Sequence, residues 1–257
     1  MKTLIHFGCS FAVGNGVPKY FEGLEAGALI NLRKNRSEFK KKYGMNAEET
    51  STCGSRIAKR LGLQLKKVAE NGASNEMVVR RLLQTKIGKK QFVLIGLTSY
   101  NRREALTTQR NNTHWHTWKM VDPKSPPRYK DLPFTPWIHR EETHYEPALE
   151  ADGQIRTATQ ILYMQSFLKS KNVRYLMFNA LHNGFDQPLT SECRRLLEQV
   201  DTKHFYNLRG GFDECQHGWC LKRKLVVSDL DDHPNVPGQQ AWAEQLLPQA
   251  KDIWNVD

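Results

Sequence analysis

The stretch TLIHFGCSFAVG at residues 3–14 joins a short apolar segment to a serine flanked by small residues. Leu4 and Ile5 favour a buried strand, and Gly8 and Gly14 bracket the loop that carries Ser10. In open α/β folds, ligands bind at the carboxyl ends of the strands, which is where such a loop places the Ser10 hydroxyl. A serine needs a neighbouring base to act as a nucleophile, so a catalytic role for Ser10 requires a base elsewhere in the chain.

Segments of strand and helix character alternate along most of the sequence. Strand patterns occur at residues 3–9, 63–69, 91–99, 173–181 and 203–208, and helical patterns near 51–61, 75–83, 154–170, 191–200 and 237–247. This alternation is typical of βαβ units. The near-continuous apolar run at 91–99 suits a central parallel strand that is covered on both faces. We therefore predict a three-layer α/β/α (flavodoxin-like) fold with about five parallel strands.

Residues 100–153 interrupt the alternation after the third strand and are too long for an ordinary connection. They contain several prolines and the tryptophans Trp115, Trp118 and Trp137. Long loops in compact domains are usually lids or binding elements, so we predict such an insertion within a single domain spanning residues 1–257. A segment that only packs its tryptophans against the body is the alternative. We also predict a surface excursion at 15–53 and irregular structure at 209–230.

The composition restricts the compartment and the partners. A net charge of +11 over 257 residues favours acidic partners, either nucleic acid or an anionic carbohydrate, although a plain basic protein has the same balance. No apolar run approaches the ~20 residues of a membrane span, and the N-terminal apolar segment is too short for a signal peptide. Five cysteines, an odd number, suit a reducing environment. These features predict a cytoplasmic protein without a membrane span.

The sequence offers weak candidates for a metal site. Cys215, His217 and Cys220 lie close together and are zinc-ligand types, but the second ligand pair that a zinc site needs is missing nearby. His114 and His116 have the spacing of ligands on a strand, and scattered loop histidines are usually plain surface. We therefore predict no metal.

The strongest candidate for a base lies near the other end of the chain, in the sequence DLDDHPNVPG at residues 229–238. His233 stands just before a helix that is signalled by Pro237, and Asp231 or Asp232 can accept the second imidazole proton. Asp231 is preferred because the side chain of an immediate neighbour points elsewhere in an extended segment, and Asp229 is a further option. The competing interpretation is a solvated turn with a helix cap.

These segments together resemble the SGNH (GDSL) hydrolase family. Gly8-Cys9-Ser10 resembles its first block, and Asn71-Gly72-Ala73-Ser74-Asn75 the block that supplies the oxyanion glycine. Gly96-Leu97-Thr98-Ser99 and Asp231-Asp232-His233 are placed like the last two blocks. The resemblance implies a serine esterase with a Ser10–His233–Asp231 triad, Gly72 with Asn75 or Thr98 as oxyanion-binding residues, and no cofactor or metal.

The sequence departs from the pattern of this family at its third block. Thr98 occupies the position where the family has an asparagine whose amide helps to bind the oxyanion, and Asn75 or Asn101 could replace it. Losing an oxyanion donor slows catalysis, so a catalytically impaired binding or particle-assembly protein is the first alternative. A nucleic-acid-binding protein, suggested by the charge of +11, is the second. The tryptophan-bearing insertion and the basic charge favour an acylated carbohydrate as substrate, including an anionic one.

Overall fold

The computed structural model describes residues 2–14, 51–109, 112–119, 146–229 and 231–256. Its centre is a five-stranded sheet in the order β2-β1-β3-β6-β7. The strands are β1 (Thr3–Gly8), β2 (Gln64–Ala69), β3 (Gln91–Leu97), β6 (Arg174–Asn179) and β7 (Phe205–Tyr206). Every neighbouring pair in this sheet is parallel. The carboxyl ends of all five strands therefore meet at one edge, as in flavodoxin-like folds.

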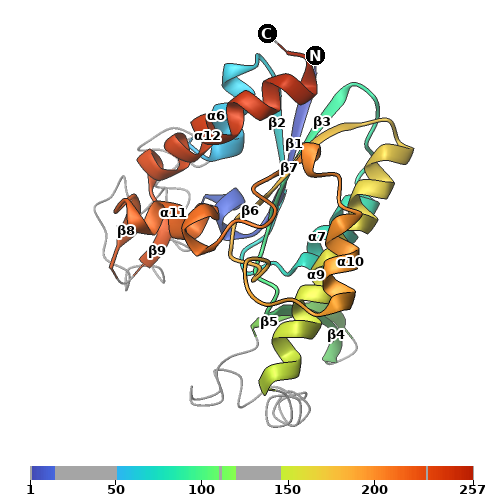
Figure 1. Cartoon of the computed structure of the whole chain (residues 1–257). Coiled ribbons are helices and arrows are strands. Elements are labelled where there is room, and N and C mark those ends of the chain that lie inside the picture. The colour runs from blue at the N-terminus through green and yellow to red at the C-terminus, as the bar shows by residue number, and fades with distance from the viewer. Residues whose placement is uncertain (1, 15–50, 110–111, 120–145, 230, 257) are drawn as a thin grey trace.

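Helices cover both faces of the sheet and form the two outer layers of the three that the sequence predicts (Figure 1). On one face lie α6 (Cys53–Arg60) and α12 (Val236–Trp254). On the other lie α7 (Asn75–Gln84), α9 (Glu146–Ser170) and α10 (Ser191–Glu198). The predicted three-layer α/β/α fold is thus confirmed. Two buried clusters fill the spaces between the layers, and alternate residues of β1 divide between them, with Leu4 in one and Ile5 in the other.

Local signals in the sequence explain where several helices begin and end. The side chains of Thr52, Ser74 and Thr190 cap α6, α7 and α10 by accepting the backbone N–H of the third residue of each helix. Just past the end of α6, Gly62 takes a left-handed conformation with φ of 62°. The helices predicted near residues 51–61 and 75–83 are confirmed.

The long insertion is partly regular. Its first part forms an antiparallel hairpin of β4 (Arg102–Gln109) and β5 (Asn112–Lys119). Its last part belongs to α9, which begins at Glu146 rather than near residue 154 as predicted. The function of this insertion as a lid or binding element stays a prediction. Most of the predicted excursion at 15–53 lies outside the described residues, and so do residues 120–145.

The prediction of irregular structure at 209–230 is wrong. The segment contains two helices, η3 (Phe212–Glu214) and α11 (Gln216–Lys222), and the strand β8 (Val226–Ser228). Strand β8 pairs antiparallel with β9 (Asp231–Pro234), so His233, whose neighbours Pro234 and Asn235 favour a loop, lies on a short hairpin strand. These elements are too short for a clear hydrophobic period, and α11 is capped by the Cys215 thiol, which is not among the usual capping groups.

Two further element lengths differ from the prediction. The predicted fifth strand at 203–208 is reduced to β7, because residues 202–204 form the short helix η2 (Thr202–His204). The last helix continues past Leu247 and Pro248 to Trp254. Burial of Ala250, Ile253 and Trp254 extends its apolar stripe and offsets the backbone hydrogen bond that a proline lacks.

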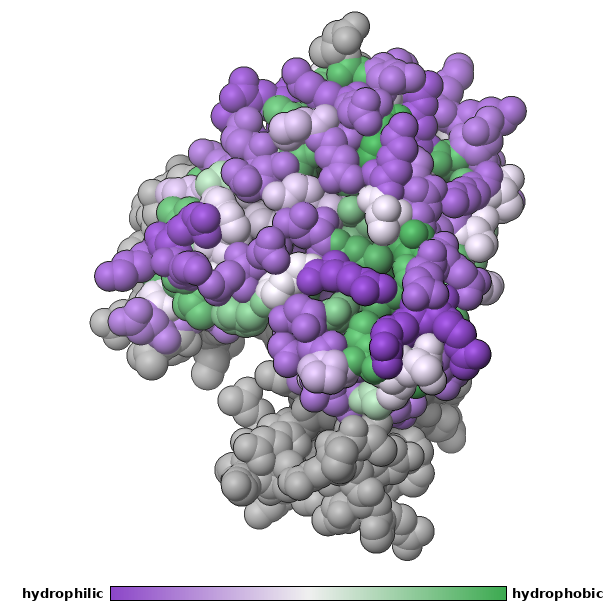
Figure 2. Space-filling view, viewed as in Figure 1, coloured by the Kyte–Doolittle hydropathy of each residue, from purple (hydrophilic) through white to green (hydrophobic). Residues whose placement is uncertain are grey.

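Hydrophilic residues cover most of the face seen in Figure 2, with smaller hydrophobic areas between them. The large hydrophobic residues that are exposed in the described part of the chain are Leu83, Tyr163, Phe212 and Leu221. Of the helices that the structure describes, none is both long enough and apolar enough to cross a membrane.

Candidate functional site

Ser10 lies at the carboxyl end of β1 and begins the short helix α1 (Ser10–Val13). The chain can pass this close to its neighbours because Gly8 has no side chain. A Cβ atom at Gly8 would lie 3.0 Å from the Ala12 Cβ and 3.2 Å from the Gly96 carbonyl oxygen. Ser10 is 6% exposed, so its hydroxyl lies in a largely enclosed environment. The position at a strand end agrees with the expectation from the sequence.

His233 contacts Ser10 from the far end of the chain. Its Nε2 lies 3.0 Å from the Ser10 Oγ, although the two residues are 223 positions apart. The ring of Phe11 packs edge-on against the imidazole, with 5.4 Å between the ring centroids. Phe11 is buried and follows Ser10 directly, so it fixes the imidazole beside the hydroxyl.

The acid that contacts His233 is Asp231. Its Oδ1 lies 2.7 Å from His233 Nδ1 and also accepts the backbone N–H of His233 at 3.2 Å. Asp231 is only 6% exposed, whereas Asp229 is exposed at the surface. Ser228 pairs with Asp231 in the β8–β9 hairpin, which holds the carboxylate in place. Ser10, His233 and Asp231 therefore form a continuous chain of hydrogen bonds.

Asp232 turns the other way, because successive side chains of a strand point to opposite faces. Its Oδ2 lies 2.9 Å from Nε2 of His217, a residue of α11. This hydrogen bond is the largest of the effects that lower the pKa of the Asp232 carboxyl. The structure therefore contains a second histidine–carboxylate pair next to the first, with Phe11 packed edge-on against both imidazoles.

Two of the predicted oxyanion residues bind each other. The Asn75 amide donates to the Thr98 carbonyl oxygen at 3.0 Å and accepts the Thr98 backbone N–H at 2.9 Å. Both residues are almost fully buried, with 2% and 0% exposed. The Thr98 Oγ1 has no hydrogen-bond partner. Gly72 lies in an exposed turn after β2, with a left-handed φ of 74°. Neither Gly72, Asn75 nor Thr98 lines the pocket at Ser10.

An open pocket of about 310 Å³ adjoins the Ser10 hydroxyl, and we call it the Ser10 pocket. It is lined by Ser10, Phe11, Ser99, Tyr100, Asn101, Arg102, Leu181, His182, Phe212, His217, Asp232 and His233. Asn101, which the sequence offered as a substitute for the missing asparagine, is among them. Its Oδ1 is buried and has no hydrogen-bond partner.

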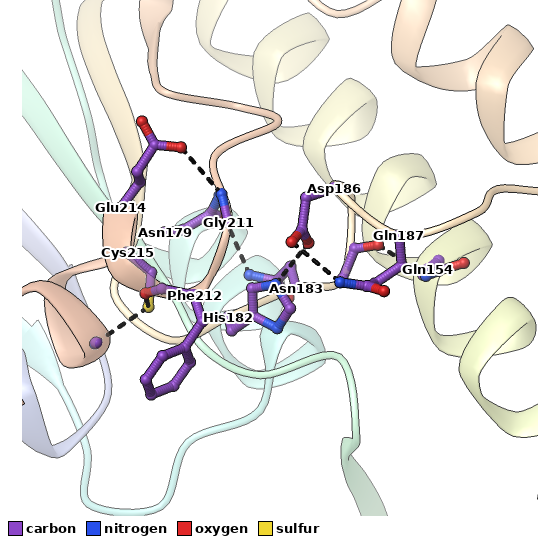
Figure 3. A network of polar contacts seen from close by, with 12 residues as sticks. Gln154, Asn179, His182, Asn183, Asp186, Gln187, Gly211, Phe212, Glu214 and Cys215 are labelled. Carbon is purple, nitrogen blue, oxygen red and sulfur yellow. Dashed lines mark hydrogen bonds and ion pairs between the residues drawn. The ribbon is translucent and has the colours of Figure 1, made fainter.

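One wall of the pocket is built from two loops at the carboxyl edge of the sheet, which Figure 3 shows from close by. In the loop after β6, Asn183 donates to the Asn179 Oδ1 and to the Leu181 carbonyl, and Gln154 of α9 donates to the Gly184 carbonyl. This loop presents His182, whose Nε2 lies 2.6 Å from Asp186 Oδ1. The polar network thus fixes a histidine at the pocket.

The second loop leads through η3, which carries Phe212, into the first turn of α11, which carries His217. The His217 backbone N–H donates to the Ala180 carbonyl at 3.0 Å, which joins the two loops. Phe212 is 41% exposed and packs edge-on against both His182 and His217. Sequence reasoning did not assign His182, Phe212 or His217 to the site. The sequence could have indicated His182, because this residue directly follows the predicted strand at 173–181.

The described residues contain one group of three side chains whose ligand-type atoms lie within 4.8 Å of one another, namely Asp231, Asp232 and His233. Both ring nitrogens of His233 are already engaged, one with Ser10 and one with Asp231. A metal ion at this position would have to displace one of these contacts. The Cys215–Cys220 segment does not form such a group.

All five cysteines are free and buried. Burial raises the pKa of the Cys53 and Cys220 thiols to about 12. Burial also raises the pKa of Cys193 and Cys215. Because the thiolate is the nucleophilic form, these four residues are poor nucleophiles. The contact with the His233 imidazole is made by the Ser10 hydroxyl, next to Cys9 in the sequence.

The fold and the site together define a three-layer α/β protein with a Ser–His–Asp hydrogen-bond chain at the carboxyl ends of its strands. Residues 35–252 match a family of unknown function designated DUF6071, so the chain belongs to that family. A comparison with curated proteins found no match.

Several solved structures are similar, and they include carbohydrate esterases and lipolytic enzymes. A carbohydrate esterase family 2 enzyme with a carbohydrate-binding domain from Corynascus thermopiles (Myceliophthora fergusii) is 15% identical with a TM-score of 0.47, and the match covers 99% of this chain and 67% of that one. A lipolytic G-D-S-L family member from Veillonella parvula is 8% identical with a TM-score of 0.44, and the match covers 98% of each chain.

A phospholipase A1 from Streptomyces albidoflavus is 12% identical with a TM-score of 0.44, and the match covers 98% of this chain and 99% of that one. These identities and scores are too low to transfer an activity to this chain. Its function has to follow from its own residues.

Proposed function

We propose that the protein is a serine esterase that hydrolyses an acyl ester through Ser10, His233 and Asp231. The observation that supports this most is the unbroken contact from the Ser10 Oγ to His233 Nε2 at 3.0 Å and from His233 Nδ1 to Asp231 at 2.7 Å. Both distances are within the reach that proton transfer needs, and a strand end is where α/β enzymes place such groups.

The chemistry follows from the roles of the three side chains. The Ser10 Oγ attacks the ester carbonyl carbon while His233 Nε2 takes the hydroxyl proton. His233 then gives this proton to the alcohol leaving group, and an acyl-enzyme remains on Ser10. Water attacks the acyl-enzyme with His233 again as the base, which releases the acid and restores the serine. Asp231 keeps the proton on Nδ1 and stabilises the imidazolium that forms during both steps.

The oxyanion needs donors that differ from those the sequence suggested first. Thr98 and Asn75 satisfy each other through the Thr98 backbone, so their hydrogen-bonding groups are not directed to the pocket. Asn101 lines the pocket and has an unpaired amide oxygen. Rotation of an amide side chain exchanges its oxygen and its NH2, so Asn101 can turn a donor to the pocket. We propose the Ser10 N–H and the Asn101 amide as oxyanion donors, and we drop Gly72 because it lies in an exposed turn outside the pocket.

Turnover of p-nitrophenyl acetate tests the proposed activity. We expect the wild type to hydrolyse this ester and Ser10→Ala to lose at least ~10³-fold in kcat. Ser99→Ala is the matched control, because Ser99 also lines the Ser10 pocket, whereas His233 Nε2 contacts the Ser10 Oγ. Equal activity of wild type and Ser10→Ala would remove the proposal. That the natural ester is an acylated carbohydrate stays a prediction.

A catalytically impaired binding protein is the second candidate function. The observation that favours it is the burial of the Thr98 Oγ1 away from the pocket, which leaves the oxyanion with fewer side-chain donors. A fluorophosphonate probe separates the two candidates, since an active site is labelled at Ser10 and an inactive one is not. No feature of the described residues favours the nucleic-acid alternative.

A further inference from the structure

Arg102 lines the Ser10 pocket, and none of the carboxylates in the described part of the chain pairs with it. The residue is half-buried. Its guanidinium Nη1 donates a hydrogen bond to the Ala73 carbonyl oxygen at 3.3 Å. A guanidinium carries five N–H donors and is always charged, so a single long bond to a neutral oxygen leaves most of its capacity unused. A charge in this position is costly to bury unless a partner arrives.

The neighbouring arginines make the contrast clear. Arg80 pairs with Glu104, Arg103 with Asp152, and Arg156 with Glu76 at 3.0 Å. These three ion pairs connect α7, α9 and the start of β4, where structural carboxylates are available. Arg102 lies in the same region but faces the pocket, and none of those carboxylates pairs with it. The carboxylate that does line the pocket, Asp232, is engaged with His217.

The turn that carries Arg102 is held firmly. The Arg102 backbone N–H donates to the Ser99 carbonyl at 3.1 Å, which closes the turn. The Tyr100 hydroxyl donates to Glu150 at 3.3 Å, and Arg156 donates to the Tyr100 carbonyl at 3.1 Å. A Cβ atom at Gly153 would lie 2.5 Å from the Tyr100 ring, so α9 packs tightly against this turn. The backbone that carries Arg102 is therefore held in place beside the pocket.

We propose that the Ser10 pocket takes an ester that carries a carboxylate, and that Arg102 binds this carboxylate. The pairing is geometrically favourable because a guanidinium and a carboxylate form two parallel hydrogen bonds. The pocket of about 310 Å³ holds both Ser10 and Arg102, so the ester and the carboxylate belong to one small molecule or to one residue of a larger one. This inference rests on the proposed esterase function and specifies its substrate class.

Matched pairs of esters test the proposal and show which half of the substrate carries the charge. Mono-p-nitrophenyl succinate and p-nitrophenyl butyrate compare a charged with a neutral acyl group. Para-acetoxybenzoate and its methyl ester compare a charged with a neutral leaving group. We expect the wild type to favour the anionic member of at least one pair in kcat/KM by about 10-fold to 100-fold. Absence of a preference in both pairs would overturn the proposal.

Arg102→Gln should abolish this preference, mainly through a higher KM for the anionic ester, while the neutral esters change far less. Arg102→Lys keeps the positive charge and should retain part of the preference. Arg195→Gln removes one exposed charge from α10, outside the pocket, and controls for general attraction of anions to a protein of net charge +11. A preference that survives in Arg102→Gln, or that falls equally in Arg195→Gln, would contradict the assignment.

Binding to Ser10→Ala separates this inference from the esterase activity itself. Calorimetry measures the affinity of Ser10→Ala for para-acetoxybenzoate, for mono-p-nitrophenyl succinate and for their neutral counterparts, and then repeats the measurement with Arg102→Gln added. Tighter binding of an anionic ester that depends on Arg102 supports the carboxylate site even if the wild type hydrolyses neither ester. Equal affinities for charged and neutral compounds would exclude it, whatever the activity.

Discussion

Asp231 holds His233 through a single carboxylate oxygen. Its Oδ1 accepts the ring Nδ1–H at 2.7 Å and the backbone N–H of the same histidine at 3.2 Å. This double contact is available because the acid stands two residues before the base on a strand, where both project to one face. It fixes the orientation of the imidazole relative to the backbone that carries it, and so its approach to Ser10.

The first prediction concerns this contact. Asp231→Asn should lower kcat for p-nitrophenyl acetate by about 10²- to 10⁴-fold, because an amide favours the wrong tautomer of His233 and does not stabilise an imidazolium. Steady-state kinetics on the purified variant measure the effect. Asp232→Asn is the matched control, since it breaks the contact with His217 and leaves Asp231 in place. A larger loss in Asp232→Asn than in Asp231→Asn would reverse our assignment of the acid.

The second prediction distinguishes Asn101 from Thr98. Asn101→Ala should lower kcat by about 10²- to 10³-fold through the loss of one oxyanion donor. Thr98→Val should leave kcat nearly unchanged and raise the free energy of unfolding by about 1 kcal/mol, because it removes a buried hydroxyl that has no partner. Kinetics and urea titration of the two variants test this. A drop in kcat confined to Thr98→Val would restore Thr98 as the oxyanion residue.

The central sheet was predictable because its signals are local. The apolar run that forms β3 and the helical pattern that forms α7 both depend on nearby residues, and both elements are where the sequence placed them. The proximity of Ser10, Asp231 and His233 followed only from the resemblance to the SGNH family, since Asp231 and His233 lie on β9, outside the parallel sheet. The catalytic roles of these residues stay predictions.

The remainder of the pocket depends on long-range packing that no local pattern encodes. The Asn75 amide was assigned to the oxyanion, but it binds a backbone segment that is 23 residues further along the chain. The pairing of His217 with Asp232 requires both α11 and the β9 strand, which were predicted as irregular structure and a loop. Short elements stabilised by tertiary contacts have too little periodicity to be recognised.

The third prediction tests the wall of the pocket. A Cβ atom at Gly218 would lie 2.0 Å from the Phe212 carbonyl oxygen, and this backbone atom cannot move freely. Gly218→Ala should therefore lower the free energy of unfolding by about 1–3 kcal/mol and shift Phe212 and His217 at the pocket. Gly88→Ala is the control, because a Cβ atom there meets nothing within 4 Å. Thermal unfolding and esterase kinetics measure both variants, and equal stability of the two would show that the contact relaxes easily.

The fourth prediction concerns His6, which β1 buries completely beneath α6. Neither ring nitrogen has a hydrogen-bond partner, and a Cβ atom at Gly54 would lie 2.3 Å from the His6 Nδ1. Burial, with a smaller contribution from the charge of Lys67, lowers the pKa of His6 from its ordinary value of 6.5 to about 3. The group is therefore neutral in the folded state at pH values where it is protonated in the unfolded chain.

The sign of the pH dependence follows from proton binding. Between pH 3 and pH 6.5 the unfolded chain binds a proton at His6 that the folded protein does not, so the free energy of unfolding rises with pH in this window. The contribution of this residue approaches about 1.4 kcal/mol per pH unit. His6→Leu should lose this part of the slope, measured by urea titration at several pH values. Ile5→Leu, a neighbouring core substitution, should shift stability equally at every pH. An identical slope in His6→Leu and wild type would mean that the folded protein protonates His6 as readily as the unfolded chain does.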